Sequence, residues 1–162
     1  MAMTIKTDGI EELGAMLAKL DGKAYDVASA GLYQGAGKVG DAFTAATNSI
    51  KTEKFHYVVN GKPRLASPEE KAALLGKSGI ARFNRNGDGV DTIIGISGAA
   101  GYANVGGKQK AVRLIARSIN SGTSFMQKQP VYRKAVSASK GAAQEAIVRE
   151  IEKQFNEIIG GK

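Results

Sequence analysis

The chain of 162 residues is long enough to bury a hydrophobic core and is most simply one domain. It contains no cysteine, which excludes disulfide bonds, thiolate chemistry and metal sites built on cysteine. Its net charge of +8 fits contact with nucleic acid or with an acidic protein surface, and it also fits a charge that serves only solubility.

No apolar run reaches membrane-spanning length, and the N-terminus lacks the hydrophobic region of a signal peptide. We therefore expect no membrane partner and a protein that is made and kept in the cytosol. Aromatic residues make up only 6% of the chain and glycine contributes 21 residues, so small side chains supply much of the apolar pattern. Because small side chains bury little area each, oligomerisation would add stability that a monomer lacks.

Two amphipathic helices are predicted over an N-terminal helical region, residues 8–47. Asp8 and Glu11 form a capping-box-like pair ahead of apolar residues at helical spacing, and this first helix spans residues 8–20. The second helix runs over residues 24–47 and is interrupted by four glycines: Gly31, Gly35, Gly37 and Gly40. Each exposed glycine inside a helix costs up to about 1 kcal/mol relative to alanine. The glycines therefore predict either close approach by another helix or a neighbouring subunit, or a broken or kinked helix.

The middle region, residues 48–107, is predicted to be rich in β-structure. The aromatic and β-branched segment Phe55–Val59 is typical of a strand, and Asn60-Gly61 favours a hairpin-type turn. The segment from Ser67 to Glu70 favours the start of a short helix that ends at Leu75.

A β-hairpin is predicted in the second half of this region. Its strands are Ile80–Phe83 and Val90–Ile96, and its turn covers Asn84–Gly89, where Asn-Gly and Asp-Gly pairs occur. A flexible glycine-rich connector is expected to follow over Ser97–Gly107.

Patterns that suggest catalysis or metal binding fail at required positions. Residues 84–89 are similar to the start of a calcium-binding EF-hand loop, but Gly95 stands where a bidentate glutamate is needed. Gly76-Lys77-Ser78 ends like a phosphate-binding loop, but Lys71 occupies the position of its first glycine. His56 is the only histidine, so a typical zinc site within one chain is excluded. The sequence therefore predicts no catalytic residue, no metal, no cofactor and no enzymatic activity.

The C-terminal region, residues 108–162, carries the strongest pattern. A short basic amphipathic segment at Gln109–Asn120 leads into a Gly122-Thr123-Ser124 turn, and the chain then passes Phe125 to reach Pro130. Proline suits the first turn of a helix, where its missing N–H would have no partner. A long helix to Ile159 is predicted from apolar residues at a spacing of three and four: Ala135, Ala138, Ala142, Ala146, Ile147, Ile151, Phe155 and Ile158.

Positive charge gathers in the same region. Four cations lie at helical spacing, and further cations follow with aromatic residues among them: Lys108, Lys110, Arg113 and Arg117, then Lys128, Arg133, Lys134 and Lys140, with Tyr102, Phe125 and Tyr132. The pattern fits a track for a phosphate backbone, bound without sequence preference and weakened by salt, and it equally fits a solvated helix face. No base-reading motif accompanies it.

This region resembles the HK97 gp10-like family of tail components of tailed bacteriophages. Members of that family tend to show a hydrophobic helix running into a Gly-Thr-Ser turn, then a proline, an aromatic or aliphatic pair, an alanine and a long amphipathic helix. The matching features here are Ile115–Ile119, Gly122-Thr123-Ser124, Gln129-Pro130-Val131-Tyr132 and Ala135. The chain departs from the family where Asn120-Ser121 replaces the usual acid and where Gln127 replaces a second proline.

The resemblance implies a structural virion protein of the neck or tail, assembled in the host cytoplasm, that forms a ring and joins or caps the tail for DNA passage. Such rings commonly hold about six or twelve copies. Its partners would be its own copies, the adjacent head-completion, connector and tail proteins, and genomic DNA through non-specific contact. The side chains expected to face DNA or a partner ring are Lys108, Lys110, Arg113, Arg117, Arg133 and Lys134. Those expected to serve the turn and subunit packing are Gly31, Gly35, Gly122, Thr123, Phe125, Pro130 and Tyr132.

The alternative is a free-standing, non-specific DNA-binding protein of nucleoid type, which would share the charge and the lack of an active site. In either case the predicted fold is a single α+β domain over residues 1–162. It has a small, mainly antiparallel sheet packed against N-terminal helices and a long C-terminal helix.

Overall fold

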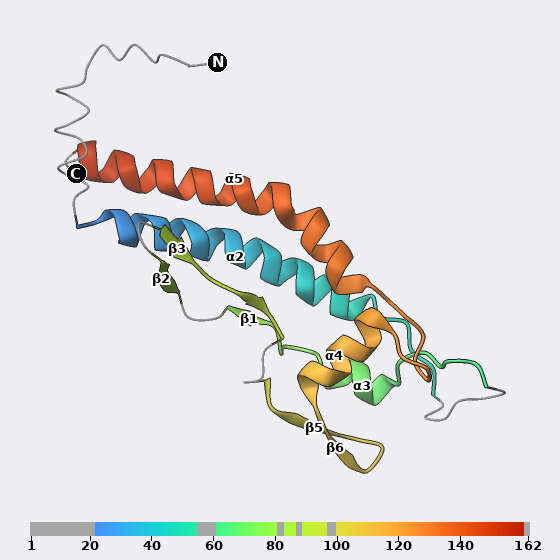
Figure 1. The fold of residues 1–162 in the computed structure, drawn as a ribbon. Helices are drawn as coiled ribbons and strands as arrows, with labels where there is room; N and C mark the ends of the chain where they lie inside the picture. The colour runs from blue at the N-terminus through green and yellow to red at the C-terminus, as the bar shows by residue number, and fades with distance from the viewer. Residues whose placement is uncertain (1–21, 55–60, 81–82, 87–88, 97–99, 161–162) are drawn as a thin grey trace, which may run out of the picture.

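A computed structural model describes residues 22–54, 61–80, 83–86, 89–96 and 100–160. The predicted helix at 8–20, the predicted strand at 55–59 and Asn60 lie outside the described residues. Two long helices lie side by side, and the smaller elements gather along one of them and at one end of an elongated molecule (Figure 1). With helices and small antiparallel strand pairs, the predicted α+β class is confirmed.

Helices α2 (Ala24–Asn48) and α5 (Val131–Gly160) form an antiparallel pair, at the bounds that the sequence predicts to within about one residue (Figure 1). Two α2 glycines allow their close approach. A Cβ atom on Gly31 would lie 2.8 Å from Cγ1 of Ile151, and one on Gly35 would lie 2.5 Å from Cγ1 of Ile147. The close contact is therefore made by another helix of the same chain, and α2 continues through its glycines without a break.

The buried face of α5 differs from the predicted apolar stripe. Ser139 and Ala143 are buried, whereas Ala138 and Ala142 are exposed, so the prediction of those two alanines as stripe residues is wrong. The Ser139 hydroxyl donates a hydrogen bond to the carbonyl of Val136 (3.3 Å), which lets a polar side chain lie in the interface. Alanine and serine are similar in size, and a hydropathy pattern built from alanine distinguishes poorly between neighbouring faces of a helix.

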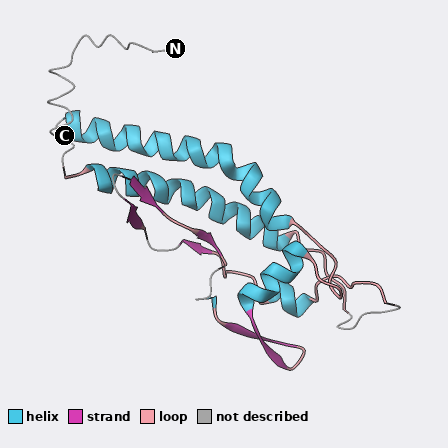
Figure 2. Cartoon of the chain, viewed as in Figure 1, coloured by secondary structure: helices cyan, strands magenta, loops and turns pink. Residues whose placement is uncertain are grey.

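The β-hairpin that the sequence predicts is present, and it lies along α2 (Figure 2). At the base of the hairpin, β1 (Gly79–Ile80) pairs with β4 (Ile94–Gly95). In its outer part, β2 (Asn84–Asn86) pairs with β3 (Gly89–Asp91), and both pairs are antiparallel. The predicted turn at 84–89 is too long, because Asn86 already pairs with Gly89. Main-chain hydrogen bonds extend the ladder through polar residues, which a pattern of apolar side chains does not reveal.

A second hairpin corrects two predictions. Strands β5 (Tyr102–Val105) and β6 (Lys108–Ala111) pair antiparallel where a flexible connector and then a helix are expected. Gly106 and Gly107 join them with φ of 59° and 75°, the left-handed conformations that a tight hairpin turn favours. Helix α4 (Val112–Ser121) begins only after β6. Lys108 and Lys110 therefore lie on a strand and share no helical face with Arg113 and Arg117.

The short helix α3 (Pro68–Ala72) begins as predicted, with Ser67 and Glu70 forming a capping box, and it ends before the predicted Leu75. It packs with α4 and the β5–β6 hairpin at the end of the helix pair where α2 finishes and α5 begins (Figure 1). The buried apolar residues of this end form one cluster with those of the helix pair: Ile50, Ala66, Leu74, Val105, Val112, Ile115, Ala116, Ile119 and Met126, continuing into Phe43, Ala46 and Tyr132. Apolar packing is therefore continuous between the helix pair and this end.

Candidate functional site

The Gly-Thr-Ser turn is a closed loop that follows α4. Gly122 has φ 76° and ψ 166°, a conformation that is essentially restricted to glycine. The Thr123 hydroxyl accepts a hydrogen bond from the N–H of Met126 (3.0 Å), and the Thr123 N–H donates to the Met126 carbonyl (2.9 Å). Gly122 and Thr123 thus form the turn that the sequence predicts.

The loop docks on an extended segment at Arg64, a contact that sequence reasoning does not anticipate. The Arg64 N–H donates to the carbonyl of Phe125 (3.0 Å), and the Gln127 N–H donates to the carbonyl of Arg64 (2.7 Å). These two bonds form a parallel bridge between Arg64 and Met126. Arg64 therefore holds the loop through backbone bonds on either side of Met126, and the position of the loop depends on Arg64.

The Arg64 side chain is fixed by a buried ion pair with Glu70. Its two terminal nitrogens donate to the two carboxylate oxygens of Glu70, each at 2.7 Å, and Glu70 is only 2% exposed. Burial alone would raise the pKa of Glu70. Hydrogen bonds from Arg64 and from the Ser67 N–H, together with the charges of Arg64 and Lys110, lower that pKa to about 2. Both partners are therefore charged at neutral pH, and the hydrogen bond to Glu70 raises the pKa of Arg64.

The start of α5 is attached to the end of α2 by two polar contacts. The Gln129 side chain accepts a hydrogen bond from the Lys51 N–H (2.9 Å) and donates one to the Lys51 carbonyl (3.0 Å). The Tyr132 hydroxyl lies 3.0 Å from the Thr47 hydroxyl, and its ring stacks on Phe43 with centroids 5.1 Å apart. Burial raises the pKa of Tyr132, and the hydrogen bond with Thr47 opposes that rise.

A groove of about 450 Å³ opens beside α4. Three large apolar residues on it are exposed to solvent: Tyr102 (74%), Leu114 (53%) and Phe125 (48%). Lys110 and Arg113 lie on the same groove. Such a combination of exposed apolar surface and charge is typical of a protein-binding surface. We call it the α4 groove.

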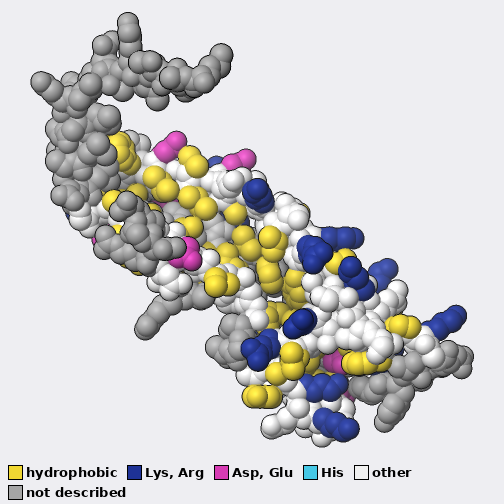
Figure 3. Space-filling view, in the orientation of Figure 1, with side chains coloured by type: hydrophobic (Ala, Val, Ile, Leu, Met, Phe, Trp, Pro, Cys, Tyr) yellow, Lys and Arg dark blue, Asp and Glu magenta, His cyan; other side chains and the backbone are white. Residues whose placement is uncertain are grey.

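Positive charge is concentrated at the end of the molecule that carries this groove (Figure 3). We define the basic end as residues 48–54, 61–78 and 100–134. It holds thirteen cations against three acids (Glu53, Glu69 and Glu70), and the cations are Lys51, Lys54, Lys62, Arg64, Lys71, Lys77, Lys108, Lys110, Arg113, Arg117, Lys128, Arg133 and Lys134. In the helix pair beyond it, residues 22–47 and 135–160, five cations face six acids. The charge is therefore segregated along the molecule.

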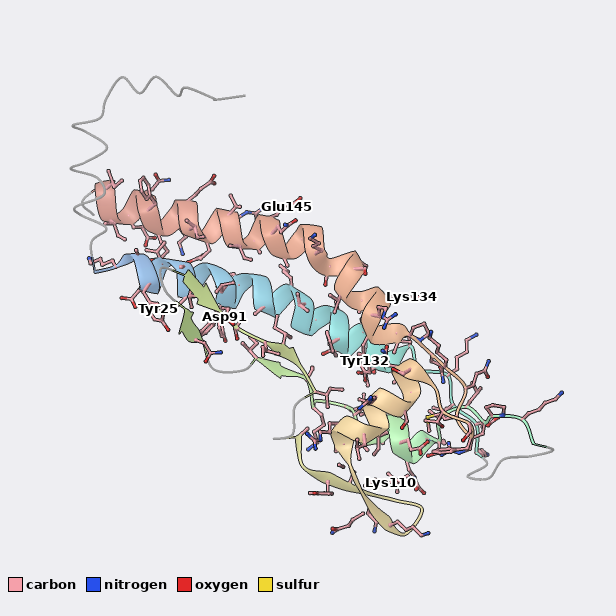
Figure 4. All side chains as sticks on the ribbon, in the orientation of Figure 1. Tyr25, Asp91, Lys110, Tyr132, Lys134 and Glu145 are labelled. Atoms are coloured by element: carbon pink, nitrogen blue, oxygen red, sulfur yellow. The ribbon has the colours of Figure 1, made fainter. Side chains whose placement is uncertain are left out.

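The residues predicted to contact DNA or a partner all lie in the basic end. Lys108, Arg113, Arg117, Arg133 and Lys134 are exposed. Lys110 is half-buried, with its Nζ 3.4 Å from a carboxylate oxygen of Glu70 (Figure 4). Lys110 therefore serves in part to neutralise a carboxylate of its own chain.

The residues predicted for subunit packing differ in how far they are buried. Gly31, Gly35 and Tyr132 are buried inside the chain, so they pack its own helices, and Tyr132 lies at the junction of α5 with α2 (Figure 4). Pro130 precedes α5 and is half-buried. Phe125 is the one large apolar side chain of the set that is exposed.

Sequence reasoning does not single out Arg64, Glu70 or Leu114. The capping-box spacing of Ser67 and Glu70 marks a helix start, but it does not reveal that Glu70 also binds a distant arginine. Leu114 looks like one more apolar residue of an amphipathic helix, and only the position of α4 shows it to be exposed.

Comparisons of the chain with protein-family models, with curated proteins and with solved structures find no match. Within the described part of the chain, no group of three or more histidine, aspartate or glutamate side chains could hold a metal ion. No helix in that part combines the length and the apolar character needed to cross a membrane.

Proposed function

We propose that the chain is a structural subunit of the head–tail junction of a tailed bacteriophage, where copies of it form a ring that joins or caps the tail for DNA passage. The observation that carries this proposal is the α4 groove, an exposed apolar surface bordered by cations on a well-anchored end of the molecule. A surface of this kind suits repeated contact with other proteins.

The position of the Gly-Thr-Ser turn supports the same proposal. The stretch that resembles the phage family runs from α4 through Pro130 into α5. It connects the basic end to the helix pair. Its turn is fixed by Arg64 on one side, and its Gln129 is fixed by Lys51 on the other. A junction subunit has to keep its contact surface in a defined position while the particle assembles, and this anchoring supplies that rigidity.

The charge of the basic end favours acidic partners. Exposed cations on α4 and at the start of α5 would steer docking of an acidic neighbouring ring, because complementary charges speed association and set orientation. Cations that face a channel would contact DNA phosphates without reading bases, and too many of them would hold the genome back.

A reversal of two charges on α4 tests this function. The double substitution Arg113→Glu with Arg117→Glu affects two exposed side chains of α4, so the fold should survive. We expect heads and tails to accumulate unjoined, counted by electron microscopy of lysates in which the variant is the only source of the subunit. The matched control is Lys23→Glu with Lys38→Glu, two exposed cations outside the basic end, which should leave joining unchanged. Normal joining with the α4 variant would contradict the proposal.

The second candidate function, a non-specific DNA-binding protein, is favoured by the thirteen cations of the basic end. It predicts that the isolated chain binds duplex DNA at physiological salt. It also predicts that the logarithm of the binding constant falls by about 0.9 per phosphate contact for each tenfold rise in salt. A junction subunit should bind duplex DNA only weakly under the same conditions, so filter binding across a salt series separates the two.

A further inference from the structure

The α4 groove runs along one edge of β6. Three successive residues of β6 line it, Gln109, Lys110 and Ala111, whereas only Tyr102 of β5 does so. Successive side chains of a strand point to opposite faces, so a groove that touches three in a row follows the edge of the strand. In the described part of the chain β6 pairs only with β5, and no strand lies beside its other edge.

The pairing of β6 with β5 shows which main-chain groups this edge presents. The Val112 N–H donates to the Gly101 carbonyl (3.0 Å), one step beyond the pair of Tyr102 with Ala111. Bonded and non-bonded positions alternate in an antiparallel pair, so Gln109 and Ala111 direct their N–H groups away from β5. The Gln109 carbonyl points the same way, while the Ala111 carbonyl lies at the start of α4. Strand β6 therefore offers donors and an acceptor to an added strand.

The loop that follows α4 forms another wall of the groove, and its main chain is already bonded. The Met126 N–H donates to the Thr123 hydroxyl, and its carbonyl accepts from the Thr123 N–H. The Phe125 carbonyl accepts from the Arg64 N–H. An incoming segment would therefore find main-chain partners on β6 and exposed apolar surface on Phe125 of the loop and Leu114 of α4.

The charge on the groove favours an acidic segment. Arg113 lines the groove, is exposed, and forms no ion pair among the described residues. A carboxylate placed beside it would gain a charged partner without breaking an existing pair. The surrounding basic end, with thirteen cations against three acids, would repel a basic segment and attract an acidic one.

A nucleic acid fits the groove less well than an acidic peptide. The two cations that line the groove are Lys110 and Arg113, and Lys110 is shared with the buried carboxylate of Glu70 at 3.4 Å. A nucleic acid carries a phosphate at every nucleotide and is held by many such cations. A peptide needs only one cation here, because its main chain can bond to β6.

We propose that the α4 groove binds an extended acidic segment of a partner protein, which adds as a strand to the free edge of β6. Main-chain bonds to Gln109 and Ala111 hold the segment, and its alternate side chains point into the groove. Apolar side chains cover Leu114 and Phe125, and an acidic one pairs with Arg113. The inference rests on the proposed junction function and deepens it, since it names the chemistry of the partner that meets the basic end.

Short random peptides displayed on yeast and selected against the purified full chain supply the probes. We expect the enriched peptides to place aspartate or glutamate and large apolar residues at alternating positions, because a bound strand presents every second side chain to the groove. Failure to enrich any peptide, or enrichment of basic peptides, would overturn the proposal.

The substitution Ala111→Pro tests the strand addition with these peptides. Ala111 has φ −65°, the value that the proline ring imposes, and its N–H lies outside the β5–β6 ladder, so the fold should be retained. Proline removes the outward N–H and places ring carbons in the path of an added strand. We expect binding at least about tenfold weaker in fluorescence anisotropy.

The matched control for this variant is Ala111→Val, which adds a side chain of similar size but keeps the N–H. It should bind the selected peptides like the natural chain, and thermal unfolding checks that both variants are folded. Equal binding by the proline and valine variants would overturn the strand addition.

A pair of charge reversals tests the acidic preference. Arg113→Glu changes a residue that lines the groove, and Arg117→Glu changes an exposed residue of the same helix that does not line it. We expect the first to weaken binding of the selected peptides at least about tenfold and the second to weaken it much less, because charges act most strongly at short range. Equal effects of the two would overturn the assignment of the site.

Two further outcomes separate this proposal from its alternatives. An oligothymidylate that displaces the peptides, and binds the Ala111→Pro variant as well as the natural chain, would assign the groove to nucleic acid and overturn the proposal. Peptide binding that depends on Ala111 and Arg113, in a protein missing from virions, would retain the site and remove the phage role. Normal joining of heads and tails by a chain that binds no such peptide would retain the role and remove the site.

Discussion

At the scale of single residues, Glu70 is the group on which the basic end most depends. It is nearly inaccessible to solvent and accepts hydrogen bonds from Arg64 and from the Ser67 N–H, while Arg64 holds the loop at Phe125. Removing one member of a buried ion pair leaves the other charge without compensation, which costs about 3–5 kcal/mol.

We therefore expect Glu70→Gln to lower the free energy of unfolding by about 3 kcal/mol at pH 7, measured by urea denaturation. The matched control replaces both partners with apolar residues, Arg64→Met with Glu70→Leu, and should recover much of the loss. A loss as large in the double variant as in Glu70→Gln would show that the ion pair is not the cause.

The same carboxylate predicts a dependence of stability on pH. Its pKa falls from 4.5 to about 2 on folding, so the ionised form is favoured in the folded state. The stabilisation, about 3 kcal/mol, is complete above the unfolded pKa of 4.5 and is lost as the pH falls towards 2. The natural chain should lose stability over this range more steeply than Glu70→Gln does. Parallel curves for the two proteins would contradict the assignment.

The glycines of α2 give a matched pair of substitutions. A Cβ at Gly35 would lie 2.5 Å from Cγ1 of Ile147 and 3.0 Å from the Ala143 carbonyl oxygen, whereas one at Gly37 would meet nothing within 4 Å. Gly35→Ala should therefore lower the free energy of unfolding by about 1–3 kcal/mol. Gly37→Ala should raise it by about 0.5–1 kcal/mol through helix propensity. Equal effects of the two substitutions in thermal unfolding would refute the close contact of α2 with α5.

At the scale of elements, the Gly-Thr-Ser turn determines the path of the chain between α4 and α5. Gly122 combines a positive φ with an extended ψ, and a Cβ there would lie 3.0 Å from Cβ of Lys128. Gly122→Ala should cost about 1–3 kcal/mol of stability and displace the loop that carries Phe125. The control is Gly76→Asn, at a positive φ with open space around it, where asparagine is tolerated. A stable Gly122→Ala protein with unchanged Phe125 exposure would contradict this role of the turn.

The sequence predicts the long elements of the fold well and the short ones poorly. The bounds of α2 and α5 follow from long periodic patterns, and the capping box fixes the start of α3. The β5–β6 hairpin is missed because Tyr102–Val105 is short and the basic residues that follow happen to fit a helical spacing. Gly106-Gly107 is the signal that could have found it.

The candidate site is predictable only in part, for a related reason. Cations can be counted in a sequence, and those predicted to face a partner do lie in the basic end. The exposure of Leu114 and the pairing of Arg64 with Glu70 depend on how distant segments meet, which no local pattern specifies.

At the scale of the whole molecule, charge is segregated along the length of the described structure. The basic end carries the α4 groove and holds thirteen cations against three acids, whereas residues 22–47 and 135–160 hold five cations and six acids. Positive charge concentrated at one end resists contact between two such ends and favours an acidic partner there.

Electron microscopy of intact virions, with the subunit located by a visible tag, tests the proposed function most directly. The proposal predicts ring-shaped density at the junction of head and tail that contains the tag. Virions that lack the tagged subunit, or that carry it away from the junction, would contradict the proposal.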